Sequence, residues 1–187
     1  MRLYSKLHFF LLLASLSLTA CSAGNTQVLE GTVTGIADGD TLYVLDAMRK
    51  SHKIRLLGID APERGQAFGE KSRQSLARLT YRKLVSVDWQ GRDNYGRILG
   101  RVRVAAPECR QTSCPKTIDA NLQQVRSGLA WWNRKFADGQ FPGDARVYEK
   151  AERAARAARA GLWSERNPVP PWRWRYANRN ETDKVRP

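Results

Sequence analysis

The chain has 187 residues and a formal net charge of +14, because 32 Lys and Arg residues outnumber 18 Asp and Glu residues. This length suits a single domain, and so positive a balance indicates a polyanionic partner, either nucleic acid or an anionic membrane face. With two histidines and no G-x-S-x-G or Walker sequence, neither a serine triad nor a P-loop is expected, and any catalysis should depend on carboxylates and arginines.

The first twenty residues have the pattern of an export signal. Arg2 and Lys6 precede an apolar run at 8–18 that is too short to cross a bilayer, and small residues then lead to Cys21. The pattern resembles a bacterial lipoprotein signal, cut before Cys21, whose thiol would carry a lipid anchor. A plain secretory signal with an accidental cysteine and an uncleaved anchor are the alternatives. Ser22 favours the outer membrane in a cell that has one, so we expect an exported, lipid-anchored envelope protein, or one released from the cell.

The expected domain boundaries follow from this signal. Cleavage removes residues 1–20 with their two positive charges, so the net charge falls from +14 to +12. We expect residues 21–26 to be a tether, 27–176 to be the folded domain, and 177–187 to be a disordered tail.

Five apolar runs alternate with polar residues and are bounded by turn residues, which is typical of short strands. They cover residues 27–36, 41–46, 52–59, 83–91 and 97–105. Three further segments repeat apolar residues at helical spacing. They cover residues 67–81, 118–127 and 143–160. This order predicts an α+β fold, a closed five-stranded β-barrel of the oligonucleotide-binding (OB) kind with about three α-helices.

The segment 167–180 is rich in proline and aromatic residues and should run extended. In this segment Trp172, Trp174 and Tyr176 alternate with two arginines. We expect a strap that packs back on the domain. Base stacking and contact with a membrane surface are the alternatives.

Cys109 and Cys114 remain as a pair if Cys21 carries lipid. Outside the cytoplasm such a pair is expected to form a disulfide, which contributes about 2 kcal/mol in the loop-entropy model. Zinc is not expected, because His52 is the one histidine left after cleavage and structural zinc takes four nitrogen or sulfur ligands. His52 alternates with Ile54 in a strand-like run and is expected to be structural or exposed.

Acidic residues stand in short turns at the ends of predicted strands. If the first strand gives way to the second at Asp40 and the third ends at Asp60, both carboxylates lie at one end of the barrel. Two carboxylates, a backbone carbonyl and waters make an oxygen-lined site suited to Ca²⁺. Asp38 and Asp40 could instead simply close a turn.

Glu63 and two arginines complete a set suited to phosphodiester hydrolysis. Glu63 could aim at a water held by the metal, Arg55 lies on the third strand, and Arg97 follows the turn DNYG. Guanidinium groups and a metal neutralise the charge that builds on phosphoryl oxygens, while a carboxylate orients or deprotonates the water. Taken alone, Arg55 could be an exposed strand residue.

Five motifs together resemble the thermonuclease (staphylococcal nuclease-like) family. They are ADGDTLYV, IRLLGIDAPE, DNYGRILGRV, GLAWW and GLWSERNPVPPW, in the family's order from about Val33 to Trp174. The resemblance implies a Ca²⁺-dependent endonuclease of broad specificity on DNA and RNA, built on an OB barrel. It also implies cleavage of the bond to the 5′ oxygen, which leaves 3′-phosphate ends. No obligate protein partner is evident.

Matched by position, the resemblance assigns metal ligands. Asp40 and Asp60 match the two carboxylate ligands, and Asp38 matches an outer acid. Ala61 matches the residue whose backbone carbonyl binds the ion. Many members have Thr there, but a main-chain ligand does not need the hydroxyl.

The resemblance also assigns the groups that meet the substrate. Glu63 matches the acid that handles the attacking water, and Arg55 and Arg97 match two phosphate-clamping arginines. Tyr95 matches an aromatic residue near the nucleotide.

This chain departs from the family pattern in two places. Residues 107–117 look like an extra excursion closed by the disulfide. The family's base-stacking tyrosines have no clear match, so Trp131, Trp132 and Phe136 are the candidates, although the two tryptophans are rather expected to be buried.

The leading hypothesis is therefore a lipid-anchored calcium nuclease. The alternative is a non-catalytic OB-fold module of the cell envelope, which would bind nucleic acid or a protein through the barrel groove. Such modules usually lose one or more of the acids and arginines, whereas this chain keeps the full set. A third reading, an envelope protein that contacts anionic lipid, leaves the ordered acids unexplained.

Overall fold

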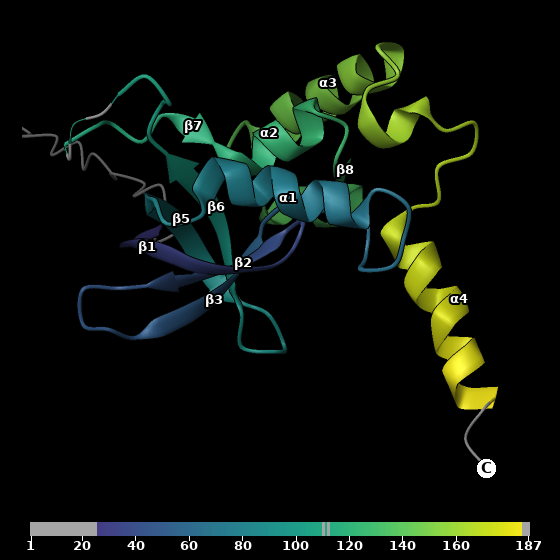
Figure 1. The fold of residues 1–187 in the computed structure, drawn as a ribbon, viewed down its shortest axis with the longest axis horizontal. Helices are drawn as coiled ribbons and strands as arrows, with labels where there is room; N and C mark the ends of the chain where they lie inside the picture. Colours follow the sequence, from purple (N-terminus) through teal and green to yellow (C-terminus); the bar gives the residue numbers. More distant parts are fainter. Residues whose placement is uncertain (1–25, 110, 112, 185–187) are drawn as a thin grey trace, which may run out of the picture.

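The computed structural model describes residues 26–109, 111 and 113–184 (Figure 1). The expected signal at 1–20 and Cys21 lie outside these residues. Among the helices of the described part, none is long and apolar enough to cross a bilayer.

Five strands form the barrel. They are β1 (Gln27–Asp38), β2 (Thr41–Leu45), β3 (Ser51–Leu56), β5 (Leu84–Arg92) and β6 (Ile98–Val104). Neighbours pair antiparallel in the order β3-β2-β1-β5-β6, and a parallel pairing of β3 with β6 closes the sheet on itself. The predicted α+β fold with a five-stranded OB barrel is confirmed.

The β6 strand illustrates how the sequence produces the barrel. Every second residue is buried, from Ile98 to Val104, and the residues between them are partly exposed, which is the period of a strand with one face on the core. Gly100 is one of the inward positions. A Cβ at this position would collide with the side chain of Val87 on β5, so glycine lets the two strands approach.

Three strands of two residues each were not predicted, because two residues are too few to show the alternation of buried and exposed positions that marks a strand. They are β4 (Ile59–Asp60), β7 (Ile118–Asp119) and β8 (Trp131–Trp132). The predicted strand 52–59 is wrong at its end: β3 stops at Leu56, and Gly58 turns the chain with a φ of 77° before β4 pairs with β8.

The three predicted helices are present. They are α1 (Gly69–Thr80), α2 (Ala120–Arg126) and α3 (Asp144–Ala157), and two 3₁₀ turns, η1 (Arg134–Gly139) and η2 (Gly161–Ser164), precede and follow α3. The α2 helix starts later than predicted because Asp119 is its N-cap, with a carboxylate oxygen that accepts from the Leu122 N–H at 2.9 Å.

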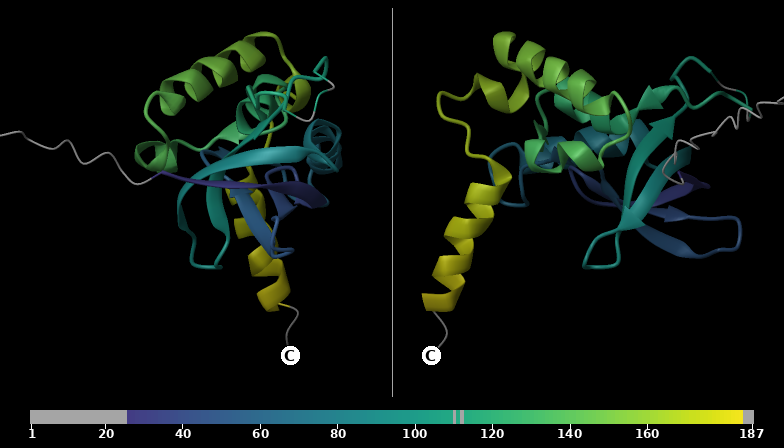
Figure 2. Two further views of the ribbon diagram at one scale, coloured as in Figure 1. Left: turned by 90° about the vertical axis from the view of Figure 1, so that its left-hand side faces the viewer. Right: turned by 180° about the vertical axis from the view of Figure 1, so that it is seen from behind.

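The prediction of an extended C-terminal segment is wrong from residue 171 onward. Pro171 is the first residue of a further helix, α4 (Pro171–Lys184), and proline suits this position because its fixed φ and missing N–H cost nothing there. The expected tail from residue 177 is also helical as far as Lys184. Figures 1 and 2 show α4 projecting from the body of the molecule.

The start of α4 packs on the domain, as expected of a strap. The Trp172 ring meets the Trp131 ring edge to face at 5.5 Å between centroids, and Trp131 meets Trp163 at 4.3 Å. The Gln66 side chain donates a hydrogen bond to the Val169 carbonyl at 2.6 Å. Trp131 is therefore a packing residue, and so is the buried ring beside it in β8.

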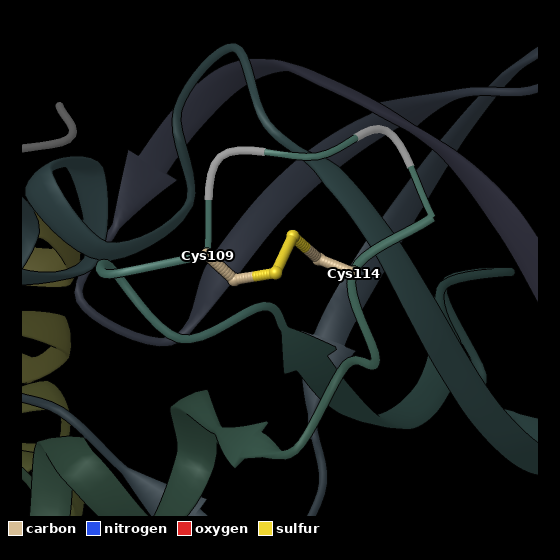
Figure 3. The surroundings of a disulfide bond; sticks show 2 residues. All are labelled: Cys109 and Cys114. Carbon is tan, nitrogen blue, oxygen red and sulfur yellow. A yellow bond between two sulfur atoms is a disulfide. The ribbon is translucent and has the colours of Figure 1, made fainter.

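Cys109 and Cys114 form the predicted disulfide, on the connection between β6 and β7 (Figure 3). His52 is structural: its Nε2 lies 2.8 Å from Oδ2 of Asp46, where the β2–β3 hairpin turns.

Candidate active site

Asp40 lies in the tight turn between β1 and β2. Asp38 stabilises this turn by accepting a hydrogen bond from the Asp40 N–H at 3.0 Å. The Asp40 carboxylate is 2% exposed, and its Oδ2 accepts from the Ala61 N–H at 2.6 Å. Asp40 thus joins the first turn of the barrel to the residue that follows β4.

A buried amide from α2 supports the same turn. Gln124 is fully buried, and its Nε2 donates to the Gly39 carbonyl at 2.7 Å and to the Ser72 carbonyl of α1 at 3.0 Å. Gly39 approaches α1 so closely that a Cβ would collide with the Ser72 hydroxyl. The turn that carries Asp40 is therefore fixed by two helices as well as by the strands.

Asp60 enters the site from β4, and Arg55 of β3 lies between the two acids. One guanidinium nitrogen of Arg55 lies 2.8 Å from Asp60 Oδ1, and another contacts Asp40 Oδ1. Asp60 is 1% exposed, and a carboxylate so deeply buried has to be paired with a positive charge. Three residues that the sequence singled out therefore meet at one point, from three different elements.

Glu63 stands nearer to solvent, with 34% of its side chain exposed. Arg175 of α4 holds its carboxylate, with Nη1 at 2.5 Å from Glu63 Oε1. The same guanidinium forms a fork with Asp60, at 3.1 Å to Oδ1 and 2.7 Å to Oδ2. Hydrogen bonding to Asp60 raises the pKa of Arg175 above its usual value.

Sequence analysis did not assign Arg175 to the site, because a Pro-rich run with alternating Trp and Arg was interpreted as an extended strap. The signal that could have placed it is Pro171, which favours the start of a helix.

Arg97 and Tyr95 lie on the hairpin between β5 and β6. Asp93 holds this hairpin: its Oδ1 accepts the N–H groups of Tyr95 and Arg97 at 2.9 and 3.0 Å, and its Oδ2 accepts from Arg97 Nε at 2.7 Å. Partial burial acts to raise the pKa of Asp93, but the hydrogen bonds from Arg97 lower it overall. Tyr95 is 85% exposed, and its ring centroid lies 5.5 Å from the Arg97 guanidinium.

Apart from Asp40, the acids and arginines described above line one cleft of about 870 Å³. Among its lining residues are Asp38, Arg55, Asp60, Glu63, Tyr95, Arg97, Phe136 and Arg175. Burial raises the pKa of Asp38, and the positive charge of Arg55 opposes this rise. Of the three aromatic candidates for base stacking, Phe136 lines the cleft, whereas Trp131 and Trp132 do not.

Among the described residues, no group of three or more Asp, Glu, His or Cys side chains is arranged so that it could hold a metal ion by itself. Asp40 and Asp60 are the carboxylates at the convergence point, so a metal at this place would take its other ligands from carbonyl and water oxygens.

Comparison with known proteins identifies the family. Residues 53–165 match the family described as "Staphylococcal nuclease homologue". The micrococcal nuclease of Shigella flexneri is 44% identical over 82% of this chain and 84% of its own length.

The chain belongs to the staphylococcal nuclease family. Other relatives are protein ParB of Escherichia coli, 37% identical over 91% of this chain and 93% of its own length, and an uncharacterized endonuclease of Haemophilus influenzae, 36% identical over 88% and 82%. The predicted family is confirmed, and it supports a hydrolytic nuclease function. Within this staphylococcal nuclease homologue, Arg175 lies beyond the matched segment 53–165.

Proposed function

We propose that this staphylococcal nuclease homologue is a Ca²⁺-dependent endonuclease that cleaves DNA and RNA with broad specificity and leaves 3′-phosphate ends. The observation that carries the proposal is the convergence of Asp40 and Asp60 on Arg55, beside a cleft that Asp60, Glu63 and Arg97 line. A non-catalytic binding module would not need buried acids held beside arginines in this way.

The donor set fits a hard divalent cation. Asp40 and Asp60 would supply two carboxylates, and Ala61, which lies against Asp40, would supply a backbone carbonyl, with water completing the six to eight oxygen ligands that Ca²⁺ takes. Asp38 would be an outer acid. Bound at this place, the ion would stabilise negative charge on the phosphoryl oxygens.

The side chains of the cleft would then divide the work of hydrolysis. The water oxygen bonds to phosphorus while the bond from phosphorus to the 5′ oxygen breaks, so the water loses a proton and the 5′ oxygen gains one. Glu63 orients the water or accepts its proton. Arg55 and Arg97 bind the phosphate oxygens and stabilise the charge that develops on them.

The charge of the chain and two exposed aromatic rings support nucleic acid as the substrate. A net charge of +14, or +12 without residues 1–20, attracts a polyanion. Tyr95 and Phe136, which are 85% and 54% exposed, line the cleft where they can stack on bases of any sequence. Binding should weaken steeply with added salt, because phosphate contacts release counterions.

Digestion of plasmid and single-stranded DNA and of RNA tests this function. We expect degradation with Ca²⁺, no degradation with a chelator, and products that gain a free 3′ hydroxyl only after phosphatase treatment. Cutting that persists in the chelator would refute the metal requirement. Binding to DNA without any cleavage would favour the binding-module alternative.

We also propose that the chain is exported and carries a lipid on Cys21, on the basis of the N-terminal pattern alone. Cys21→Ser should move the protein from the membrane fraction to the soluble fraction. Unchanged membrane association in this variant would contradict lipidation.

A further inference from the structure

Arg55 and Arg175 together engage both oxygens of the Asp60 carboxylate. Oδ1 accepts from both Arg55 and Arg175, and Oδ2 accepts from Arg175 at 2.7 Å. Nη1 of the same guanidinium also donates to Oε1 of Glu63 at 2.5 Å. A two-pronged guanidinium–carboxylate pair is one of the strongest charge-assisted contacts that side chains make. The two acids are therefore bridged by a positive charge that belongs to the chain itself.

A second cation would compete with Arg175 for this position. A divalent metal on Asp60 would lie close to the Arg175 guanidinium at Oδ2, and two positive charges at such a separation repel each other. Arg175 and a bound metal are therefore alternatives on Asp60.

The α4 helix can give up this contact without disturbing the core. From 171 to 179, the part of α4 whose side chains are described, Pro171 is the one buried residue, and the Arg175 side chain is 40% exposed. At its first turn α4 packs on the domain through Trp172, and further along Arg175 and Arg179 line the cleft. Beyond that turn the helix projects from the body of the molecule (Figure 2).

We propose that α4 is an arm that closes the active site, with Arg175 as an internal cation that competes with metal for the Asp60 carboxylate, next to Arg55. The inference rests on the proposed function, since it takes Asp60 to be a metal ligand. With the arm docked, Asp60 and Glu63 are both engaged and the site is inactive. Metal binds only the undocked form. The apparent association constant for the metal is therefore the intrinsic constant multiplied by the fraction of molecules that are undocked. By reciprocity, bound metal drives the arm away.

Calcium titration calorimetry on the full-length protein without nucleic acid tests the competition. Arg175→Gln should bind Ca²⁺ about tenfold more tightly than the wild type, because the docked state is lost. Arg173→Gln is the matched control: it removes the same charge from the same helix, Arg173 is exposed, and within the described part of α4 it is Arg175 that pairs with the two acids. If the loss of one positive charge were the whole cause, Ca²⁺ affinity would rise equally in both variants.

The outcomes separate the two proposals. If the wild type and Arg175→Gln bind Ca²⁺ equally well, α4 does not compete with the metal. The same conclusion follows if Ca²⁺ affinity rises equally in Arg175→Gln and Arg173→Gln. In both cases the proposed metal site stands. If none of them binds Ca²⁺, or if Asp60→Asn binds as well as the wild type, the proposed metal site itself fails. Weaker DNA binding by Arg175→Gln with unchanged Ca²⁺ affinity would make Arg175 a phosphate ligand and overturn the arm.

Hydrogen exchange gives a readout that does not depend on activity. A released 14-residue helix is marginal on its own, so its amides should exchange faster once the arm leaves the domain. Saturating Ca²⁺ should therefore speed exchange in peptides covering 171–184 of the wild type and leave Asp60→Asn unchanged. Exchange in α4 that does not respond to Ca²⁺ would contradict release of the arm.

Discussion

The two sides of the cleft are built in opposite ways. On the acid side, Asp40 and Asp60 are almost completely buried, and strands and helices fix them through backbone hydrogen bonds. On the hairpin side, the Tyr95 ring is exposed, and Arg97 is held chiefly by Asp93 of the same turn. The groups that would hold a metal are thus part of the fold, whereas the groups that would meet the substrate lie on a loop that can adjust to different sequences.

Glu63 lies at the edge of the acid side, and its substitution should have the largest effect. Glu63→Gln keeps the shape of the side chain but removes the charge that orients or deprotonates water, so kcat should fall by on the order of 10³. Single-turnover cleavage of a fluorescent oligonucleotide measures the loss. Glu108→Gln, at an exposed acid outside the cleft, should be as active as the wild type. If Glu63→Gln cleaved within tenfold of the wild-type rate, a difference of about 1.4 kcal/mol in activation free energy, Glu63 would have no essential role in the chemical step.

Arg97 tests the hairpin side. Arg97→Ala should lower kcat/KM by about 10²-fold because a phosphate-binding charge is lost, while the melting temperature changes little because the side chain is not in the core. Arg126→Ala, at an exposed arginine of α2, is the control for loss of one positive charge. A large drop in stability for Arg97→Ala would show that the hairpin is structural and that the contrast between the two sides is wrong.

Gln124 tests the acid side without touching any charged group. Gln124→Ala removes the side-chain hydrogen bonds to the Gly39 turn and to Ser72 of α1, which should lower the free energy of unfolding by about 2 kcal/mol. Urea denaturation followed by tryptophan fluorescence measures it. Gln123→Ala, next to it on the same helix, should lose less than half as much, since Gln123 is only partly buried. Equal losses in the two variants would mean that the turn does not depend on this amide.

The sequence predicted those parts of the fold that repeat. Five strands and three helices follow from periods of two and of three to four residues, and the family motifs then identify Asp40, Asp60, Arg55, Glu63 and Arg97 as the site. Two-residue strands such as β4 have no period to detect. Gln124 could not be distinguished from a surface glutamine, because its partner Gly39 is 85 residues away in the chain.

The C-terminal helix was mispredicted for a different reason. Alternating Trp and Arg after several prolines have the period of an extended chain, and this local pattern hid the helix start at Pro171. Arg175 was missed with it, since that side chain reaches Asp60 from the helix.

The disulfide between Cys109 and Cys114 has a consequence for how long the protein survives where thiols are present. It closes a short surface excursion between β6 and β7, and neither cysteine lines the cleft. Reduction would therefore open a loop to proteases and leave the catalytic groups in position. An oxidising environment would then determine how long the molecule lasts, and thiols in its surroundings would shorten that time before they altered how fast it works.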